Sequence, residues 1–552
     1  MSGSAKVAFL AALLFVSVAF DASADKKTVC TITVNSPDEK DIFRRYLPQD
    51  EFQFVELVER GRPDWLASAC RAGVRCDVLL ISGHFDGGTE FYTDRLDARE
   101  FLPVDEMERV ACSDSCPGLF SQLKEVYLFG CKTLNAEAMR SASAEIGRSL
   151  VRAGNSPADA ERLSRVLSER HGESNRDRMR HIFKDVPVIY GFSSKAPLGR
   201  TAGPILERYF QSGAATEVGS GRASAKLLGL FAASSMTATA GMTDADPRAG
   251  FRGDACHFSD DRLSSAQKLG FVHELLGRDM AEVRMFLDQL EKYSASLDDA
   301  ERQAPPVAAA LAEIAADQSA RERYLEFARD ADEPAVRARM LALARGLGWL
   351  TPAEQRAELM RMFGERLARN AVGSAEVDLA CSLNKGRELQ QDLHRLQPSP
   401  AQADKVANAA VLACLGSAAG HARVLRALTS PNDDDVQIAQ IYLRHRPLAD
   451  ANELRVVATG ITRMSGSEAQ VRALDTLAGH RLSDRESLEE LTRLFPLAKS
   501  VNVQRAIAGI LIRSDYQSLA RPELARALRQ HRLKSPDGQD MIDVLIRRLE
   551  AT

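Results

Sequence analysis

Several features that would point to particular functions are missing from this sequence of 552 residues. The formal net charge is only −4 and no long run of like charge occurs, so no basic field is present to attract nucleic acid. The segment "GHFDGG" at 83–88 lacks the spacing and the lysine of a phosphate-binding loop. No apolar segment after the first 24 residues is long enough to predict a membrane span. The composition therefore predicts no nucleic-acid partner, and no motif implies a cofactor.

The N-terminus has the pattern of an export signal. Lys6 precedes the apolar stretch "VAFLAALLFVSVAF", and "ASA" at 22–24 offers a cleavage site before Asp25. The apolar stretch is shorter than the roughly 20 residues that span a bilayer, and no cysteine follows the cleavage site, which argues against a lipoprotein. We therefore predict a signal peptide at 1–24 and a periplasmic or secreted protein with no membrane span after signal cleavage.

The number of cysteines is odd. An exported chain tends to pair its cysteines, so nine of them leave at least one thiol over or paired outside the chain. Cys131 is the best candidate for the unpaired thiol. If Cys131 is paired instead, Cys30 is a possible partner. The sequence does not determine the connectivity of the others. Three pairs lie close together or in the same region: Cys112 with Cys116, which can form a local bridge, Cys70 with Cys76, which flank a turn, and Cys381 with Cys414.

Strand and helix patterns alternate up to about residue 212. Short, nearly all-apolar strands that alternate with helices predict a mostly parallel sheet covered on both faces. Residues 36–39, "SPDE", have the pattern of a capping box that opens the first helix. Residues 85–122 are predicted to be irregular apart from a short helix near "PVDEMERV". The predicted strands are 28–34, 52–58, 76–82, 125–130 and 186–192, and the predicted helices are 36–46, 64–73, 135–154, a polar helical insert to about 184, and 196–212.

Two of these strands deliver a reactive side chain at their ends. "DVLLISGHFDGG" ends in His84, and "EVYLFGCKTLN" ends in Cys131. Ligands of such sheets bind beyond the carboxyl ends of the strands, so the two residues share one edge if their strands are neighbours. An imidazole can take the proton of a thiol, and main-chain N–H groups can hold a developing oxyanion. A helix expected to begin at Cys131 would also lower the pKa of its thiol.

The strand–"SGH"–loop and the strand–"FGC"–helix together resemble the His/Cys dyad of the caspase-like superfamily of cysteine peptidases (clan CD), and its CHAT branch in particular. The resemblance covers roughly residues 27–212, including "VIYGFSSKAPLGRTAGPILERYF". It implies that His84 is the general base and Cys131 the nucleophile, with the N–H groups of Phe85 and Cys131 at the oxyanion. The loop at 192–199 corresponds to a segment bordering the substrate cleft, with Ser193, Ser194 and Lys195.

The chain departs from that family at two positions next to the dyad. Phe85 follows the histidine where the family usually has glycine, and Gly130 precedes the cysteine where it has a small alanine. Charges near the dyad give conflicting indications of specificity. Asp86 and Glu90 can orient the imidazole or bind a basic substrate side chain, whereas Lys195 favours an acidic substrate.

The region 213–262 is rich in Gly, Ala, Ser and Thr, which predicts a long loop or an inter-domain connection. It contains "ACHFSDD", which places Cys256 and His257 beside Asp260 and Asp261. Adjacent cysteine and histidine lack the usual spacing of zinc ligands, so we predict no metal site there.

From residue 263 the pattern is helical throughout. Amphipathic helices that begin at Val436, Val471 and Val503 recur 35 and 32 residues apart (471 − 436; 503 − 471). Each is followed by a polar turn and a second helix, which is similar to a HEAT-like stack of helix pairs. Solenoids of this kind usually bind protein partners. The turns contain Asp450, Asp484 and Asp515.

These patterns predict a caspase-like α/β domain with a mostly parallel sheet at 25–212, a linker at 213–262 and an all-α HEAT-like solenoid at 263–552. One functional hypothesis is an exported cysteine endopeptidase that acts on a protein or peptide substrate, with a protein partner or substrate held on the helical repeats. The alternative is a catalytically inactive adaptor whose solenoid binds protein partners. Acyl transfer or another hydrolysis on the same dyad is a third possibility.

Overall fold

The structure is a computed structural model. Contacts divide the chain into two units: the first contains residues 1–275 and 281–289, and the second contains 276–280 and 290–552. The signal peptide predicted at 1–24 lies outside the described residues. The structure describes residues 26–550 except for 58–65, 86–87, 89, 95–99, 114–115, 117, 138–145, 148–149, 152–153, 172–173, 449, 466, 481, 483, 515–520 and 535–539.

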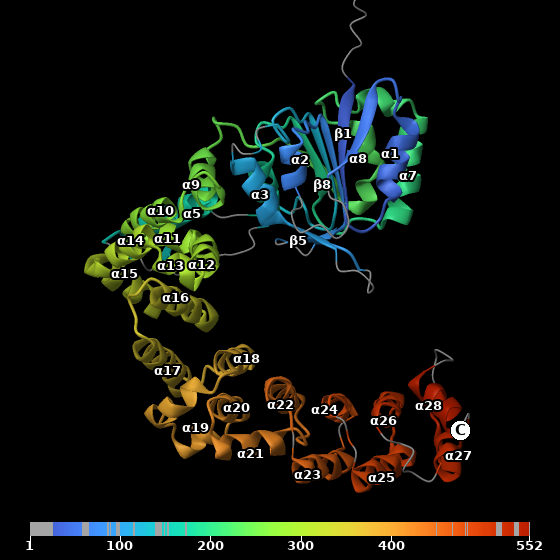
Figure 1. Ribbon diagram of the computed structural model, residues 1–552. Helices are drawn as coiled ribbons and strands as arrows, with labels where there is room; N and C mark the ends of the chain where they lie inside the picture. Colours follow the sequence, from blue (N-terminus) through green and yellow to red (C-terminus); the bar gives the residue numbers. More distant parts are fainter. Residues whose placement is uncertain are drawn as a thin grey trace, which may run out of the picture. The chain divides into compact units, whose positions relative to one another are not determined.

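The first unit is built around a six-stranded sheet with the order β2-β1-β3-β7-β8-β9. The first five strands in this order run parallel, and β9 joins the edge antiparallel to β8, so the predicted mostly parallel sheet is confirmed (Figure 1). The strands are β1 (Lys27–Thr33), β2 (Phe52–Glu56), β3 (Val78–Ser82), β7 (Glu125–Phe129), β8 (Val188–Phe192) and β9 (Met236–Thr239).

Helices cover both faces of this sheet, as the apolar strands predicted. On β3, Leu79 and Ile81 join one hydrophobic core, whereas Val78 and Leu80 join the other, because successive side chains of a strand point to opposite faces. One core includes α2 (Ala67–Arg71), α3 (Val104–Cys112) and α6 (Asn175–Ile182). The other includes α1 (Asp38–Tyr46), α7 (Gly199–Gln211) and α8 (Ala225–Leu230).

A second, smaller sheet follows directly after β3. Its strands are antiparallel, and His84 pairs with Tyr92 while Phe85 pairs with Phe91. The prediction of an irregular segment at 85–122 is therefore wrong, although the short helix expected there exists as α3. Strands of two or three residues are too short to produce a periodic pattern in the sequence. They are β4 (His84–Phe85), β5 (Glu90–Tyr92) and β6 (Phe101–Pro103).

The prediction of a long loop at 213–262 is also wrong. This region supplies β9, which is stabilised by pairing with β8, and α8, whose Leu227 is fully buried. The sequence predicted a loop here because β9 and α8 are short, rich in small residues and without a strong apolar period. Both elements depend instead on contacts with distant segments. The other elements of the region are η1 (Ala214–Glu217), η2 (Ala232–Ser234) and α9 (Ala249–Ser259).

The capping box predicted at 36–39 does not form. Helix α1 begins at Asp38 with Pro37 as its N-cap residue, and the Ser36 hydroxyl accepts a hydrogen bond from the Asp38 N–H at 3.2 Å. Glu39 is instead buried and accepts a hydrogen bond of 2.7 Å from the Ser82 hydroxyl at the end of β3. The acid expected to complete the capping box therefore lies beneath the strand that leads to His84.

Eight of the nine cysteines, all of which lie in the described residues, form disulfides, and Cys131 is free. The prediction of Cys131 as the unpaired thiol is confirmed, and Cys30 is not its partner. The local bridge between Cys112 and Cys116 is wrong, because the fold brings each of them next to a cysteine that is distant in sequence. The disulfides are Cys30–Cys76, Cys70–Cys116, Cys112–Cys256 and Cys381–Cys414.

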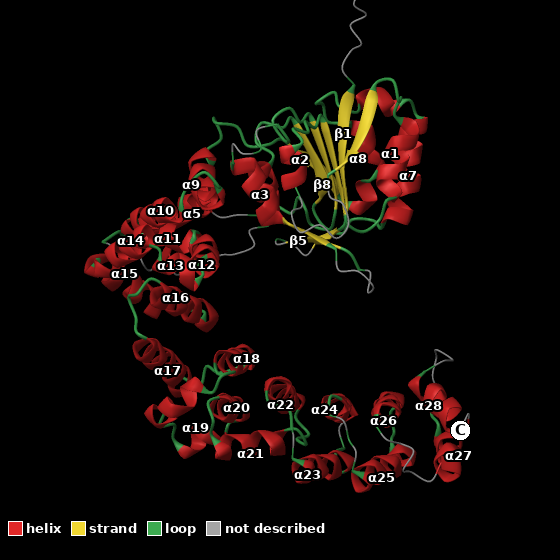
Figure 2. Cartoon of the chain, viewed as in Figure 1, coloured by secondary structure: helices red, strands yellow, loops and turns green. Residues whose placement is uncertain are grey.

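The second unit is helical throughout its described residues. Helix α18 packs on α20, and the series continues with α22, α24, α26 and α28, each on the next (Figure 2). Asp450 caps α23 and Asp484 caps α25, so these two turns lead into second helices as predicted, while Asp515 lies outside the described residues. No helix among the described residues is long and apolar enough to cross a membrane.

The helices of this unit are α13 (Asp299–Gln303), α14 (Pro305–Ala316), α15 (Gln318–Arg329), α16 (Pro334–Gly346), α17 (Pro352–Ala368), α18 (Ser374–Leu383), η3 (Glu388–Arg395), α19 (Pro400–Asp404), α20 (Val406–Cys414), α21 (Ala418–Ala427), α22 (Asp433–His445), α23 (Ala451–Thr462), α24 (Ser467–Ala478), α25 (Arg485–Leu494), η4 (Phe495–Leu497), α26 (Val501–Arg513), α27 (Arg521–His531) and α28 (Met541–Glu550). The remaining helices are α5 (Pro157–His171), α10 (Ser265–Gly277), α11 (Met280–Met285) and α12 (Leu287–Ser296).

Candidate active site

The ends of β3 and β7 bring His84 and Cys131 to the same edge of the sheet. The two strands are parallel neighbours, and Ser82 pairs with Phe129 in their register. The Gly83 N–H donates to the Phe129 carbonyl at 3.2 Å, which continues the pairing one residue further. His84 and Cys131 each follow the paired residue by two positions. The neighbouring strands required by the sequence hypothesis are therefore present.

Phe85 and Gly130 occupy complementary positions beside His84 and Cys131. A Cβ atom added to Gly130 would lie 2.9 Å from the Phe85 Cβ and 3.1 Å from the Gly83 carbonyl oxygen, closer than side chains normally approach. The Phe85 ring is buried and packs against Phe91 with ring centroids 4.7 Å apart. Phe85 therefore points into the core, and the two departures from the family pattern are coupled: the larger residue after the histidine requires glycine before the cysteine.

His84 is half-buried and has a carboxylate beside its ring. Its Nε2 atom lies 3.3 Å from Asp94 Oδ2, within ion-pair distance, but has no aligned hydrogen-bond partner among the described residues. Its ring lies 5.5 Å from that of Tyr92. Sequence reasoning missed Asp94 because the β4–β5 hairpin that brings it back to His84 has no periodic signal. It named Asp86, which lies outside the described residues, and Glu90, which lies on β5.

Cys131 lies in a tight turn, and no helix begins at this residue; most of the helix predicted at 135–154 lies outside the described residues, of which 146–147 and 150–151 are helical. Residues 131–134 form turns, and Lys132 has φ +58°, in the left-handed region that side chains other than glycine rarely adopt. The Lys132 N–H donates to the Ser194 carbonyl at 2.6 Å, and the Cys131 Sγ accepts from the Ala196 N–H at 3.4 Å. Strain of this kind is common where a reactive side chain must be presented.

Buried contacts with β8 hold this turn in place. The hydroxyl of Thr133, which is fully buried, donates to the Gly130 carbonyl at 3.2 Å and accepts from the Phe192 N–H at 3.1 Å. A Cβ at Gly191 would lie 2.6 Å from that hydroxyl, so only glycine leaves room for it. The conformation at Cys131 is therefore set by the next strand of the sheet.

Helix α6 connects the turn at Cys131 with the loop that follows His84. Its Asn175 Nδ2 donates to the Lys132 carbonyl at 2.9 Å. Its Arg178 is buried, donates to the Gly88 carbonyl and pairs with Glu108 of α3 at 2.5 Å. The sequence indicated only a polar helical insert here, and no local signal could have shown that it supports both ends of the dyad.

The loop predicted to border a substrate cleft lies next to Cys131. Ser193, Ser194 and Lys195 are exposed. The Ser193 N–H donates to the Ser235 carbonyl at 3.1 Å, and the hydroxyls of Ser194 and Ser235 lie 2.7 Å apart. The loop is thus anchored to the segment before β9 on one side and to the Cys131 turn on the other.

A buried acid lies beneath this edge of the sheet. Burial raises the pKa of Glu39 to about 7, while the hydrogen bond from Ser82 acts in the opposite direction. Ser82 precedes His84 by two residues, so Glu39 lies directly under the segment that carries His84. The protonation state of Glu39 therefore changes near neutral pH at this place in the fold. Sequence reasoning placed this residue in a capping box and did not predict its burial.

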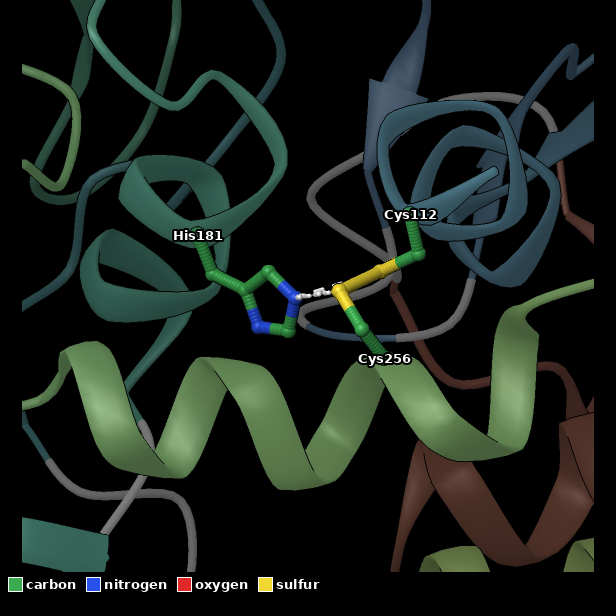
Figure 3. Close-up of side chains that lie close together, drawn as sticks. All are labelled: Cys112, His181 and Cys256. Atoms are coloured by element: carbon green, nitrogen blue, oxygen red, sulfur yellow. Dashed lines mark hydrogen bonds between the residues drawn. A yellow bond between two sulfur atoms is a disulfide. The ribbon is translucent and has the colours of Figure 1, made fainter. Parts of the chain in front are cut away.

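A second group of cysteine and histidine side chains lies elsewhere in the first unit. In "ACHFSDD", Cys256 is bonded to Cys112, Asp260 pairs with Arg262 at 2.6 Å, and His257 stacks on Phe271. These residues do not converge on one site. The histidine that does meet Cys256 is His181 of α6, which lies against the Cys112–Cys256 disulfide (Figure 3).

Comparisons of the chain with family models, with curated proteins and with solved structures found no match. The fold and the side chains therefore carry the functional argument. They define an α/β unit with a mostly parallel sheet and disulfides, a free cysteine that follows β7 next to the strand β3 that precedes His84, and an all-helical unit.

Proposed function

We propose that the protein is an exported cysteine endopeptidase of the caspase-like type, with His84 as general base and Cys131 as nucleophile. The observation that carries this proposal is that the single cysteine outside a disulfide follows β7, and that the neighbouring strand β3 ends two residues before His84. An inert structural cysteine would more commonly be paired in a chain with four disulfides. Eight paired cysteines also support an oxidising compartment, periplasmic or secreted.

The proposed reaction is acyl transfer through the sulfur. His84 takes the thiol proton of Cys131, and the thiolate attacks the peptide carbonyl carbon. The main-chain N–H groups of Phe85 and Cys131 hold the oxyanion, and Asp94 supports the imidazolium. The proton then passes from His84 to the departing amine, and water hydrolyses the thioester that remains. No cofactor takes part in these steps.

The surrounding loops supply the remaining parts of the proposal. Exposed Ser193, Ser194 and Lys195 border the substrate cleft in this proposal. The α18–α28 series is the HEAT-like solenoid that recruits the substrate or a protein partner. Stacked helix pairs present extended surfaces of this kind because each pair buries its apolar face only against its neighbours.

Thiol reactivity tests the dyad before any substrate is known. Iodoacetamide at about pH 6.5, two units below the ordinary thiol pKa of about 8.5, should label Cys131 rapidly in the parent protein and slowly in His84→Ala. Tyr92→Phe, which keeps the ring beside His84, is the matched control and should leave the rate unchanged. Equal labelling rates in the parent and in His84→Ala would show that His84 does not act as the base for Cys131.

Cleavage of a peptide library then tests the activity itself. Cys131→Ala should abolish cleavage, and His84→Ala should lower it by about 10²-fold or more. Ser193→Ala should retain most of the activity, because its hydroxyl takes no part in bond breaking. Cleavage that survives Cys131→Ala would rule out this nucleophile.

The alternative function is a non-catalytic adaptor. Two observations favour it: no hydrogen bond joins the side chains of His84 and Cys131 among the described residues, and a polar cavity of about 510 Å³ opens between α15 and α17 of the helical unit. The cavity is lined by charged groups that suit a polar partner. Under this hypothesis, Cys131→Ala changes neither cleavage nor partner binding. The charged lining residues include Arg321, Glu322, Glu326, Arg329, Glu354 and Glu358.

A further inference from the structure

Three helices bring two sulfurs and an imidazole together on the α/β unit. Cys112 is the last residue of α3, His181 belongs to α6, and Cys256 belongs to α9. His181 Nε2 lies 3.7 Å from the Cys112 sulfur and 3.8 Å from the Cys256 sulfur, and the two sulfurs are joined as a disulfide. Figure 3 shows the ring directed at the bond between them.

His181 is buried beside the two sulfurs. Its side chain is only 3% exposed, and its Nε2 is the ring nitrogen that faces them. Histidine binds a metal ion through the lone pair of a ring nitrogen, so the atom that can bind a cation already faces both sulfurs.

Exposure distinguishes the Cys112–Cys256 disulfide from the other three. Both of its cysteines are half-buried, whereas every other pair contains at least one cysteine that is no more than 5% exposed. A reductant in solution therefore reaches this bond most easily. Thiol–disulfide exchange needs direct access to a sulfur, so this pair should be the first to open in the folded protein.

We propose that Cys112, His181 and Cys256 form a zinc-type metal site when the disulfide between the two cysteines is reduced. A dithiol reductant supplies two electrons and two protons, becomes a disulfide itself and leaves two thiols. One divalent cation then binds both sulfurs and the Nε2 lone pair of His181, and the two thiol protons pass to solvent. Water completes the coordination.

The spacing of the three atoms fits this assignment. Zinc–sulfur and zinc–nitrogen bonds of about 2.3 and 2.0–2.1 Å at a tetrahedral centre place nitrogen and sulfur about 3.6 Å apart. The two observed separations of 3.7 and 3.8 Å are already close to that value. Only the sulfurs must move apart, through rotation about their side-chain bonds. Two thiolates and a divalent cation have no net charge, so no further carboxylate is required.

The three helices do not depend on the disulfide alone for their positions. Arg252 of α9 donates to the His181 carbonyl and to the Ala111 carbonyl, both at 3.1 Å. Arg109 of α3 pairs with Asp261, just beyond α9, at 3.2 Å. These contacts hold the ligands near one another after reduction, so the site is preorganised for a metal ion.

Cobalt(II) titration tests the proposal, because thiolate-to-cobalt charge-transfer bands and intense visible bands report tetrahedral sulfur ligation. A Cys131→Ala background removes the free thiol. The protein is treated briefly with dithiothreitol, which is then removed without air, and alkylation with mass spectrometry identifies the opened disulfide. We expect one cobalt ion per chain in the reduced protein, displaced by zinc, and none in the oxidised protein.

Histidine variants provide the matched comparison. His181→Gln should weaken cobalt binding by at least about tenfold, since even the loss of a residue that supports a ligand costs that much. His257→Gln, which changes the exposed histidine next to Cys256, should bind cobalt like the parent. Cys381→Ser/Cys414→Ser, which removes another disulfide, should also bind normally.

Three results would overturn the proposal: no cobalt binding after the Cys112–Cys256 bond has been opened, equal binding by His181→Gln and the parent, or opening of a different disulfide first. The comparison of the reduced with the oxidised Cys131→Ala protein needs no change at His181, so it decides the question even if His181→Gln does not fold. None of these readouts depends on peptidase activity.

Discussion

The α/β unit and the helical unit are stabilised by contacts of very different range along the chain. Disulfides in the α/β unit join residues 46, 46 and 144 positions apart, and β1 lies between β2 and β3. In the helical unit the disulfide spans 33 residues, and ion pairs link one helix to the next but one, as in Arg455–Asp484 and Arg472–Asp433. Contacts between segments that are distant in sequence can bring two particular side chains together at one site. Contacts between successive helices instead repeat a similar surface along the stack.

Removal of a disulfide from each unit gives the largest expected effect and tests this difference directly. Cys30→Ala/Cys76→Ala and Cys381→Ala/Cys414→Ala release loops of similar length, so each should cost about 4 kcal/mol. In the α/β unit, hydrogen exchange should rise across the whole sheet. In the helical unit, it should rise mainly in α18, α20 and the helices packed on them. A uniform rise through α28 would show that the stack unfolds as one cooperative block.

Glu39→Gln isolates a contribution that belongs to the α/β unit. The pKa of Glu39 is raised to about 7 in the folded state, so between about pH 4.5 and 7 the unfolded chain ionises while the folded chain does not. Stability therefore falls as the pH rises through this window, by up to roughly 3 kcal/mol. The glutamine variant keeps an acceptor for Ser82 and should lose that pH dependence.

Urea unfolding at several pH values measures this effect, with exposed Glu51→Gln as the control. The control should retain the full pH dependence of the parent protein. A parent whose stability does not fall over this pH window would contradict the assignment.

Glycine substitutions sharpen the comparison at the level of single contacts. A Cβ at Gly130 meets Phe85 and Gly83, and a Cβ at Gly420 would lie 2.6 Å from the Ala409 carbonyl between α20 and α21. Each alanine variant should be destabilised by about 1–3 kcal/mol through overpacking. Only Gly130→Ala should alter the alkylation rate of Cys131.

A double-mutant cycle identifies the partner of Gly130. Phe85→Gly removes the Cβ atom that a new side chain at position 130 would contact, so Phe85→Gly/Gly130→Ala should cost less than the sum of the two single variants. Strict additivity in the free energies of unfolding would show that the close approach of these residues does not matter.

The smallest expected effect concerns the helix caps of the helical unit. Asp450 and Asp484 both accept main-chain hydrogen bonds at the start of a helix, but Asp484 also pairs with Arg455 at 3.0 Å. Each alanine variant should lose about 1 kcal/mol through the cap, with the greater loss at Asp484. Local hydrogen exchange at α23 and α25 measures the difference, which should disappear in an Arg455→Ala background.

The cap at Asp484 also predicts a response to acid. Hydrogen bonds from Arg455 and Ser487 lower the pKa of Asp484 to about 2, below its value in the unfolded chain. Its contribution to stability is therefore complete above about pH 4 and is lost as the pH falls towards 2. Asp484→Asn should remove this part of the acid sensitivity of α25.

Much of the first unit could be predicted from local patterns. The apolar runs that became β1, β3, β7 and β8 were found within a few residues, because a strand buried on both faces is apolar along its whole length. Cys131 was singled out as the unpaired cysteine because it directly follows one of these apolar runs. Asp94, the β4–β6 sheet and β9 were missed, because each depends on a partner that is distant or too short to produce a pattern.

The sequence by itself determined the alternation of strands and helices, the helical character of the second unit and the positions of His84 and Cys131 at strand ends. These follow from side-chain periodicity, which local chain geometry imposes. Only the tertiary structure decided which cysteines pair, why Gly130 must accompany Phe85, and that His181 meets Cys112 and Cys256. Those outcomes depend on closing loops of up to 144 residues, and no local pattern in the sequence specifies where such loops close.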